Sequence, residues 1–119
     1  MDLLQKKCVP CEGGTPPLDA SAITKLMTEL KTGWVAYGQS PVTDAGAMKL
    51  KKEYKLPDFR TALAFANRVG DIAESEGHHP DMTVSYGKVV IELFTHAVSG
   101  LSENDFILAA KIDRIHYPN

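Results

Sequence analysis

Apolar and polar residues alternate clearly in one segment of the chain, which predicts a β-strand with one apolar face and one face in water. Lys52 interrupts the apolar row, and we expect its ammonium group to reach solvent at the margin of the sheet. The apolar members of the row are Met48, Leu50, Tyr54 and Leu56.

Three further segments have the composition of strands. Residues 34–37 form a short one, followed by a turn over residues 41–46. Residues 82–86 and 89–96 flank Gly87-Lys88, and this arrangement predicts a hairpin. His96 would then lie on the second strand of that hairpin.

Apolar residues spaced three and four apart predict three helices. The first begins at Asp19 or Ser21 and ends at Gly33, and the second begins at Pro57-Asp58 and ends at Gly77. The third begins at Ser102-x-x-Asp105, which has the form of a capping box. The expected buried residues are Ile23, Leu26, Met27 and Leu30 in the first helix, Phe59, Ala62, Leu63, Ala66, Val69 and Ala73 in the second, and Phe106, Leu108, Ile112 and Ile115 in the third.

The order of these elements is helix, strand, strand, helix, strand, strand, helix. It predicts an α+β fold in which a four-stranded antiparallel sheet carries its helices on one face. We expect one domain over residues 18–119, preceded by an irregular N-terminal arm over residues 1–17. The uncovered face of the sheet favours self-association.

Composition narrows the class of protein. The 119 residues are 44% hydrophobic and 24% charged, with a net charge of −2, which argues against binding to nucleic acid or to an acidic membrane. No apolar run approaches the roughly 20 residues of a membrane helix, and residues 1–7 lack the apolar stretch of a secretory signal, so we expect a cytoplasmic protein. Cys8 and Cys11 form a lone CxxC pair; we expect reduced thiols, with a metal or redox role left open.

Three of the four histidines cluster with two carboxylates in the C-terminal half of the chain. They are His78, His79 and His96, with Glu74 and Asp105 nearby in sequence. Imidazoles give and accept protons near neutral pH, so the group predicts acid/base catalysis. Glu74 precedes His78 by four residues, and we expect the two to hydrogen-bond on one helix face.

Each of these residues also has a structural explanation when it is taken alone. A histidine at a helix end interacts with the helix dipole, and a capping role suffices to explain Asp105. Trp34 and Tyr86 are of the kind that fills a core. The sequence alone leaves these alternatives open.

A wider pattern nevertheless resembles one enzyme family, the pterin-4a-carbinolamine dehydratases. The resemblance covers residues 15–115, and residues 8–17 are similar to an extension seen in some microbial members. Gly77 and the segment 81–83 depart from animal members, so the shape of the pocket is not carried over. The matching residues are Glu74-x-x-x-His78-His79-Pro80, Tyr86, His96, Gly100-Leu101-Ser102-Glu103 and Asp105, together with Trp34 and the Pro57-Asp58-Phe59 helix start.

The resemblance implies removal of water from a 4a-hydroxy-tetrahydropterin to give a quinonoid dihydropterin. It implies that His78, His79 and His96 line the pterin site, with the pterin as substrate and neither a cofactor nor a metal. Our hypothesis makes His78, oriented by Glu74, and His96 the acid/base pair, while His79 holds the ring. Asp105 is then expected to orient His96 or the ring, and Trp34 to support substrate binding.

Two other functions remain as alternatives. Animal members of the family also act as dimerisation cofactors of a transcription factor, which implies a possible interaction role without catalysis. A zinc hydrolase built on the three histidines is disfavoured, because adjacent histidines do not easily aim at one ion. The resemblance also implies a homodimer or a homotetramer. For an enzyme, it implies coupling to an aromatic amino-acid hydroxylase, with molybdopterin metabolism as the alternative setting.

Overall fold

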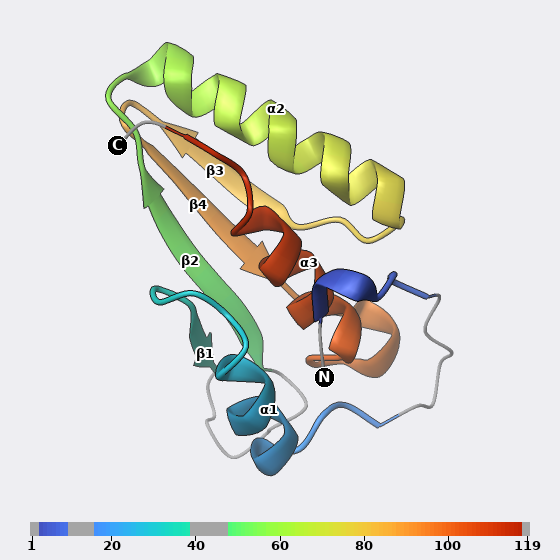
Figure 1. Ribbon diagram of the computed structural model, residues 1–119. Coiled ribbons are helices and arrows are strands. Elements are labelled where there is room, and N and C mark those ends of the chain that lie inside the picture. Colours follow the sequence, from blue (N-terminus) through green and yellow to red (C-terminus); the bar gives the residue numbers. More distant parts are fainter. Residues whose placement is uncertain (1–2, 10–15, 39–47, 118–119) are drawn as a thin grey trace.

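The computed structural model describes residues 3–9, 16–38 and 48–117 (Figure 1). The predicted turn at 41–46 and Cys11 lie outside these residues. The predicted order of helices and strands is confirmed. The elements are η1 (Leu3–Gln5), α1 (Ala20–Met27), β1 (Val35–Tyr37), β2 (Lys49–Lys55), α2 (Phe59–Glu76), β3 (Asp81–Ser85), β4 (Lys88–Leu93), η3 (His96–Val98) and α3 (Glu103–Ile112).

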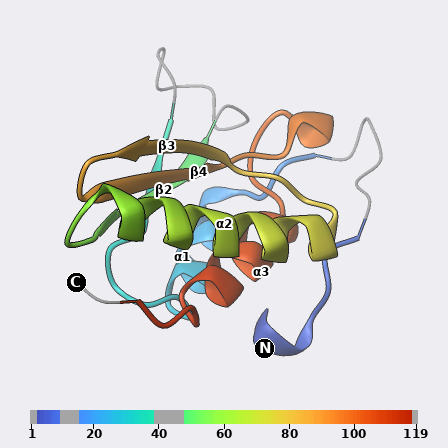
Figure 2. The same ribbon diagram turned by 90° about the horizontal axis from the view of Figure 1, so that it is seen from above.

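The four strands form one antiparallel sheet in the order β1-β2-β4-β3. The three α-helices lie on one side of this sheet, as Figure 2 shows, so the predicted α+β class is confirmed. Alternate residues of β4 are buried against the helices, namely Val89, Ile91 and Leu93. Among the described residues, no helix combines the length and the apolarity that crossing a membrane requires.

The period of two in β2 is confirmed, but the prediction for Lys52 is wrong. Leu50 and Tyr54 are fully buried, as the alternation requires. Lys52 does not reach into solvent. Its ammonium group donates to the carboxylate of Asp113, 2.8 Å away, at the end of α3. The ion pair with the buried Asp113 therefore keeps the Lys52 ammonium group out of solvent.

Asp113 also explains why α1 ends before Gly33. Its carboxylate accepts from the backbone N–H of Lys31 at 3.1 Å and from the indole N–H of Trp34 at 2.8 Å. The chain leaves the helical path after Met27 to make these contacts. Thr28 closes the last turn, with its hydroxyl donating to the carbonyl of Lys25 at 2.7 Å.

Helix α2 begins and ends where the sequence predicts. The carboxylate of Asp58 accepts from the N–H of Thr61 at 2.8 Å, which caps the first turn. Gly77 follows the last turn in the left-handed conformation, with φ 67°. The predicted buried stripe is partly wrong, because Phe59 and Leu63 are exposed. The buried residues are Ala62, Phe65, Ala66, Val69 and Ala73.

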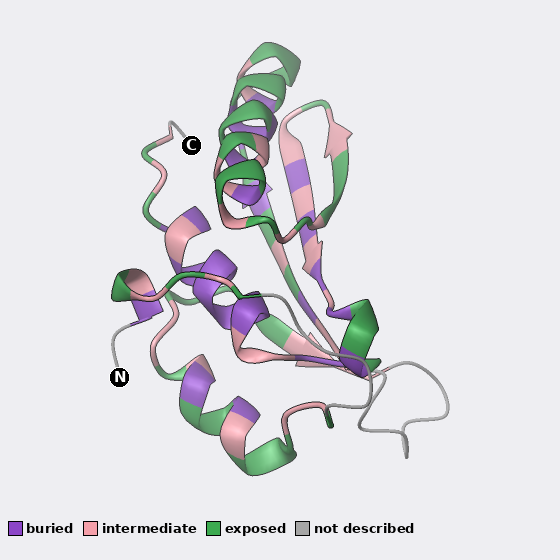
Figure 3. Cartoon of the chain, turned by 90° about the vertical axis from the view of Figure 1, so that its right-hand side faces the viewer, coloured by how far each residue is buried: buried purple, intermediate pink, exposed green. Residues whose placement is uncertain are grey.

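Helix α3 is buried along almost its whole length (Figure 3). One side of it is covered by the N-terminal segment, whose turn η1 lies against α3 (Figure 1). Leu3 from that turn belongs to the core cluster. Residues 3–9 of the predicted arm are thus packed on the domain.

Candidate active site

The three predicted histidines line one pocket of about 300 Å³. It lies where the chain leaves α2 and where it leaves β4, beside the first turn of α3. Segments far apart in sequence therefore build it together. Its lining residues are Val9, Gly77, His78, His79, Phe94, Thr95, His96, Ala97 and Asn104.

The end of α2 fixes the backbone of His78. The N–H of His78 donates to the carbonyl of Ala73 at 3.2 Å, and the N–H of Gly77 donates to the carbonyl of Glu74 at 3.3 Å. These two bonds, with Gly77 in the left-handed conformation, form a Schellman motif. Glycine takes that conformation without a Cβ penalty, so the sequence itself sets the point where the histidine pair begins.

Asp105, not Glu74, is the partner of His78. Nε2 of His78 lies 2.6 Å from Oδ1 of Asp105, and the His78 side chain is only 12% exposed. An ionised carboxylate only accepts hydrogen bonds, so Nε2 carries a proton and donates it. This leaves Nδ1 as the nitrogen with which His78 can act on a ligand.

Asp105 is held in place by two other groups while it contacts His78. Its Oδ2 accepts from the hydroxyl of Thr95 at 2.8 Å and from the backbone N–H of Ser102 at 3.0 Å. The second bond belongs to the predicted capping box, which is confirmed. Asp105 is 0% exposed, so these hydrogen bonds and the surrounding packing together fix the orientation of its carboxylate. The cap and the contact with His78 are made by one side chain.

Glu74 hydrogen-bonds to His79 instead of His78, so the expected Glu74–His78 pair is wrong. Gly77 turns the chain out of the helix before the histidines, and the four-residue helical spacing no longer applies at His78. The side chains of Glu74 and His79 are largely exposed. His79 is therefore the more freely solvated of the two adjacent imidazoles.

His96 reaches the pocket from a different element than the sequence predicts. Strand β4 ends at Leu93, and His96 begins η3. The chain turns there because Thr95 pairs with Gly100 through backbone hydrogen bonds of 2.9 and 3.3 Å. The ring of His96 packs edge-on against Phe94, with centroids 5.0 Å apart.

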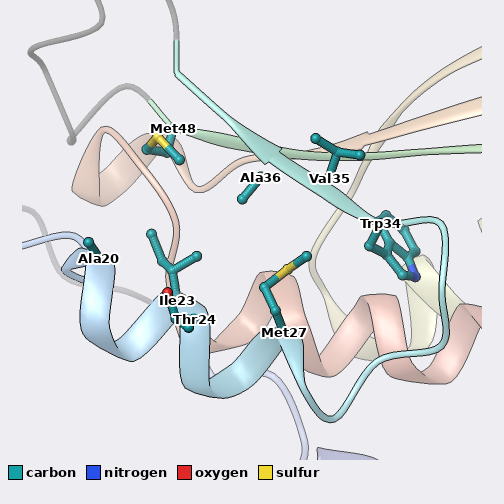
Figure 4. A pocket seen from close by; sticks show the side chains of 8 residues that line it. All are labelled: Ala20, Ile23, Thr24, Met27, Trp34, Val35, Ala36 and Met48. Atoms are coloured by element: carbon teal, nitrogen blue, oxygen red, sulfur yellow. The ribbon is translucent and has the colours of Figure 1, made fainter.

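Trp34 does not line the histidine pocket. It is buried and borders a larger cavity of about 490 Å³ between α1 and the first strands, where apolar side chains prevail (Figure 4). That cavity has no titratable group in its lining. Its lining offers space but no acid/base group, so the histidine pocket is the candidate active site.

Several lining residues were not predicted as site residues, among them Thr95, Val9 and Asn104. Thr95 sits between a strand and a turn, and Val9 and Asn104 lie 95 residues apart and meet through hydrogen bonds. No local pattern marks such contacts. The adjacent Cys8 is half-buried, and burial together with the nearby Glu76 carboxylate raises its pKa to about 12. Cys8 is thus a neutral thiol at physiological pH.

Among residues 3–9, 16–38 and 48–117, the His, Cys, Asp and Glu side chains form no group of three or more that could hold a metal ion. Two of the three pocket histidines have their Nε2 atoms at a carboxylate, His78 at Asp105 and His79 at Glu74. Each imidazole is thus oriented separately.

Comparison with known structures supports the fold. A crystal structure from Brucella melitensis, described as a transcriptional coactivator/pterin dehydratase, matches with a TM-score of 0.67 and 27% identity, over 81% of this chain and 94% of that one. A pterin dehydratase-like protein, described as a RuBisCO assembly factor in the alpha-carboxysome, matches with a TM-score of 0.54 and 21% identity, over 68% of this chain and 86% of that one. The second likeness concerns the fold alone.

Sequence relatives are closer. A protein of Rickettsia bellii is 50% identical over 93% of this chain and 91% of its own length, and one of Alkaliphilus metalliredigens is 44% identical over 95% of each. Both are provisionally named pterin-4-alpha-carbinolamine dehydratases. The family model described as pterin 4 alpha carbinolamine dehydratase matches residues 16–115, which include every predicted site residue. The chain belongs to the pterin 4 alpha carbinolamine dehydratase family.

Proposed function

We propose that this protein removes water from a 4a-hydroxy-tetrahydropterin and releases a quinonoid dihydropterin. The observation that carries the proposal is the contact of His78 with the buried carboxylate of Asp105, in a pocket shared with His79 and His96. An imidazole held by a carboxylate in this way has a fixed tautomer and a fixed orientation. Both properties suit proton transfer to or from a bound ligand.

The reaction requires two proton movements. An acid protonates the hydroxyl on C4a, the C4a–O bond breaks, and the lone pair of N5 forms the C4a=N5 bond. A base takes the proton from N5, so that water is the only group lost. The neighbouring N5 supplies the electrons, and we therefore assign no cofactor and no metal to this step.

We assign the acid/base pair to His78 and His96, which enter the pocket from two different elements. Asp105 orients His78, in place of the role expected for Glu74. His79, with Glu74, holds the pterin ring at the exposed side of the pocket. Each positioned proton transfer accelerates a reaction by about 10²- to 10⁴-fold.

A stopped-flow ultraviolet assay on freshly generated 4a-hydroxy-tetrahydropterin tests this assignment. We expect His78→Ala and His96→Ala each to lower turnover by about 10²-fold or more. His116→Ala is the matched control, because His116 is exposed and lies outside the pocket lining. Wild-type turnover in both pocket variants would remove the proposed mechanism, and no acceleration by the folded wild type would remove the reaction.

A second candidate is an interaction role, which the description of the Brucella structure as a transcriptional coactivator favours. The two roles separate through His78→Ala. If the protein acts only by binding a partner, His78→Ala keeps that binding. In that case the wild type itself does not turn over the hydroxypterin.

We propose the cytoplasm as the compartment and recycling of the cofactor of an aromatic amino-acid hydroxylase as the setting. We further propose a homodimer or a homotetramer as the working state. Light scattering on the purified protein measures its mass directly, and a monomer would contradict this assignment. The setting is tested with an aromatic amino-acid hydroxylase supplied with a limiting amount of pterin. Hydroxylase turnover should then depend on the presence of this protein.

A further inference from the structure

The N-terminal segment forms one wall of the histidine pocket. Val9 belongs to the pocket lining, although almost seventy positions of sequence separate it from His78. The family match begins at residue 16, so Val9 adds to the lining from outside the matched part of the chain.

Two contacts tie the segment to the end of α2. The backbone N–H of Cys8 donates to Oε1 of Glu76 at 2.9 Å, and the ammonium group of Lys7 donates to the carbonyl of Ser75 at 3.3 Å. Glu76 is itself fixed, because its other oxygen is paired with Lys111 of α3. These anchors lie two and three residues before His78.

The first turn of α3 holds the segment from the other side. The N–H of Val9 donates to Oδ1 of Asn104 at 3.1 Å, and Nδ2 of Asn104 donates to the carbonyl of Val9 at 2.5 Å. Lys6 pairs with Glu103 at 2.9 Å. Asn104 directly precedes Asp105, so adjacent residues of α3 hold Val9 and His78.

These paired backbone contacts fix Val9 while its side chain stays open. The side chain is 64% exposed, although it is apolar and its main chain is bound on both sides. A β-branched side chain with an ordered backbone loses little further freedom when a ligand covers it. An exposed apolar group at the rim of a pocket of imidazoles is suited to pack against a flat ring.

We propose that Val9 contacts the bound pterin and raises its affinity, and that Asn104 is the positioning residue for Val9. This proposal rests on the proposed function, because it takes a reduced pterin as the ligand. Val9 has no group that exchanges protons. Its contribution is therefore to binding, and it appears in KM while kcat is unchanged.

The first test compares Val9→Ala with Val35→Ala. Both valines are largely exposed, at 64% and 58%, but Val35 lies outside the histidine pocket. We expect Val9→Ala to raise KM by about tenfold with kcat unchanged, which is the lower end of what loss of apolar contact in a binding pocket predicts. Val35→Ala should keep the wild-type KM. An unchanged KM in Val9→Ala would overturn the proposal.

Calorimetric titration with 7,8-dihydrobiopterin separates failure of this proposal from failure of the proposed function. If the wild type binds this stable pterin and Val9→Ala binds it equally well, only the role of Val9 is wrong. If the wild type neither binds it nor turns over the hydroxypterin, both proposals are wrong. Weaker binding by Val9→Ala alone, with the wild-type affinity in Val35→Ala, supports the contact.

A double-mutant cycle tests the role of Asn104. Asn104→Ala frees the backbone of Val9, so it should raise KM to a similar extent as Val9→Ala. The double variant should then show little additional change, because both substitutions remove the same contact. Multiplied effects would show that Asn104 acts independently of Val9. The Val9→Ala test does not depend on whether Asn104→Ala folds, because substitution of an exposed residue changes the free energy of unfolding little.

Discussion

His78 and His79 are neighbours in the chain with different surroundings. His78 is nearly buried and contacts the buried carboxylate of Asp105, whereas His79 and Glu74 are both largely exposed. Contacts between exposed charged groups contribute little, because water and salt screen them. The precise orientation of an imidazole in this site therefore depends on Asp105 far more than on Glu74.

Asp105→Asn should separate the capping role from the chemical one. If the amide oxygen keeps the bonds from Thr95 and Ser102, the amide NH₂ faces Nε2 of His78. A donor at that place cannot accept a hydrogen bond from Nε2, so the substitution changes the tautomer and the orientation of the imidazole. We expect kcat to fall by about 10²-fold or more, with a small change in the unfolding midpoint.

The control for this prediction is Thr95→Ser, which keeps the hydroxyl that donates to Asp105. It should retain most of the activity. If kcat of Asp105→Asn equals that of the wild type while the variant stays folded, Asp105 serves only as a helix cap.

Glu76 makes stability depend on pH. Burial alone would raise its pKa, but hydrogen bonds from Lys111 and the N–H of Cys8, with the charge of Lys111, outweigh burial and lower it. The folded state thus favours the ionised carboxylate. This contribution is complete above the ordinary pKa of 4.5 and is lost as the pH falls through the lowered pKa.

We expect Glu76→Gln to reduce the loss of stability on acidification. Urea unfolding at pH 7 and at stepwise lower pH, down to pH 3, measures the effect in both proteins. The two curves of unfolding free energy should lie furthest apart at neutral pH and converge in acid. Parallel curves would show that Glu76 does not titrate differently in the folded and unfolded states.

At the scale of elements, local signals in the sequence predict some boundaries and not others. Each end of α2 is set by a residue next to it in the chain. Asp58 caps the start and Gly77 the end, and both predictions are confirmed. The end of α1 depends on Asp113, 82 residues from Lys31. The end of β4 depends on the pairing of Thr95 with Gly100, across a turn that no local pattern marks. Both boundaries therefore depend on contacts that form only when the chain has folded.

Substitution by alanine should change stability in opposite directions at two glycines of α2 and its end, Gly77 and Gly70. Gly77 has φ 67°, where a Cβ is strained. Gly70 lies inside α2, and beyond the adjacent helix backbone nothing lies within 4 Å of the position of an added Cβ. Gly77→Ala should destabilise the fold by about 1 kcal/mol, because the left-handed conformation disfavours an L side chain. Gly70→Ala should stabilise it by about 0.5–1 kcal/mol through helix propensity.

Thermal and urea unfolding of the two variants check this pair. Each variant serves as the control of the other, since both add one methyl group to α2 or its end. Shifts of the same sign would contradict the assigned conformation of Gly77. A fall in kcat that accompanies Gly77→Ala alone would further show that this turn positions His78.

Across the whole molecule, α3 connects the candidate active site with the core. Its first turn carries Asp105 against His78, and its last residue is followed by Asp113, which accepts from four donors. The sequence predicts that the three histidines share a site, because they and the carboxylates form one dense group. It does not predict that Asp105 contacts His78, 27 residues away, because that contact depends on how α3 packs across the end of α2.

Asp113, Lys52, Tyr54 and Trp34 form a buried polar cluster. Its two charged members should differ in their effect on stability. Asp113→Ala leaves the ammonium of Lys52, the hydroxyl of Tyr54 and the indole N–H of Trp34 without their acceptor. Lys52→Met leaves Asp113 with both neutral side-chain donors and the N–H of Lys31. It also removes a cation from a nearly buried position.

We therefore expect Asp113→Ala to lower the free energy of unfolding by about 3–5 kcal/mol, as an uncompensated buried charge requires. Lys52→Met should cost clearly less, because a buried cation carries a desolvation penalty that disappears with it. Urea unfolding of both variants at pH 7 measures the order. A loss in Lys52→Met as large as in Asp113→Ala would mean that the ion pair itself, and not the set of neutral donors, holds β2 to the end of α3.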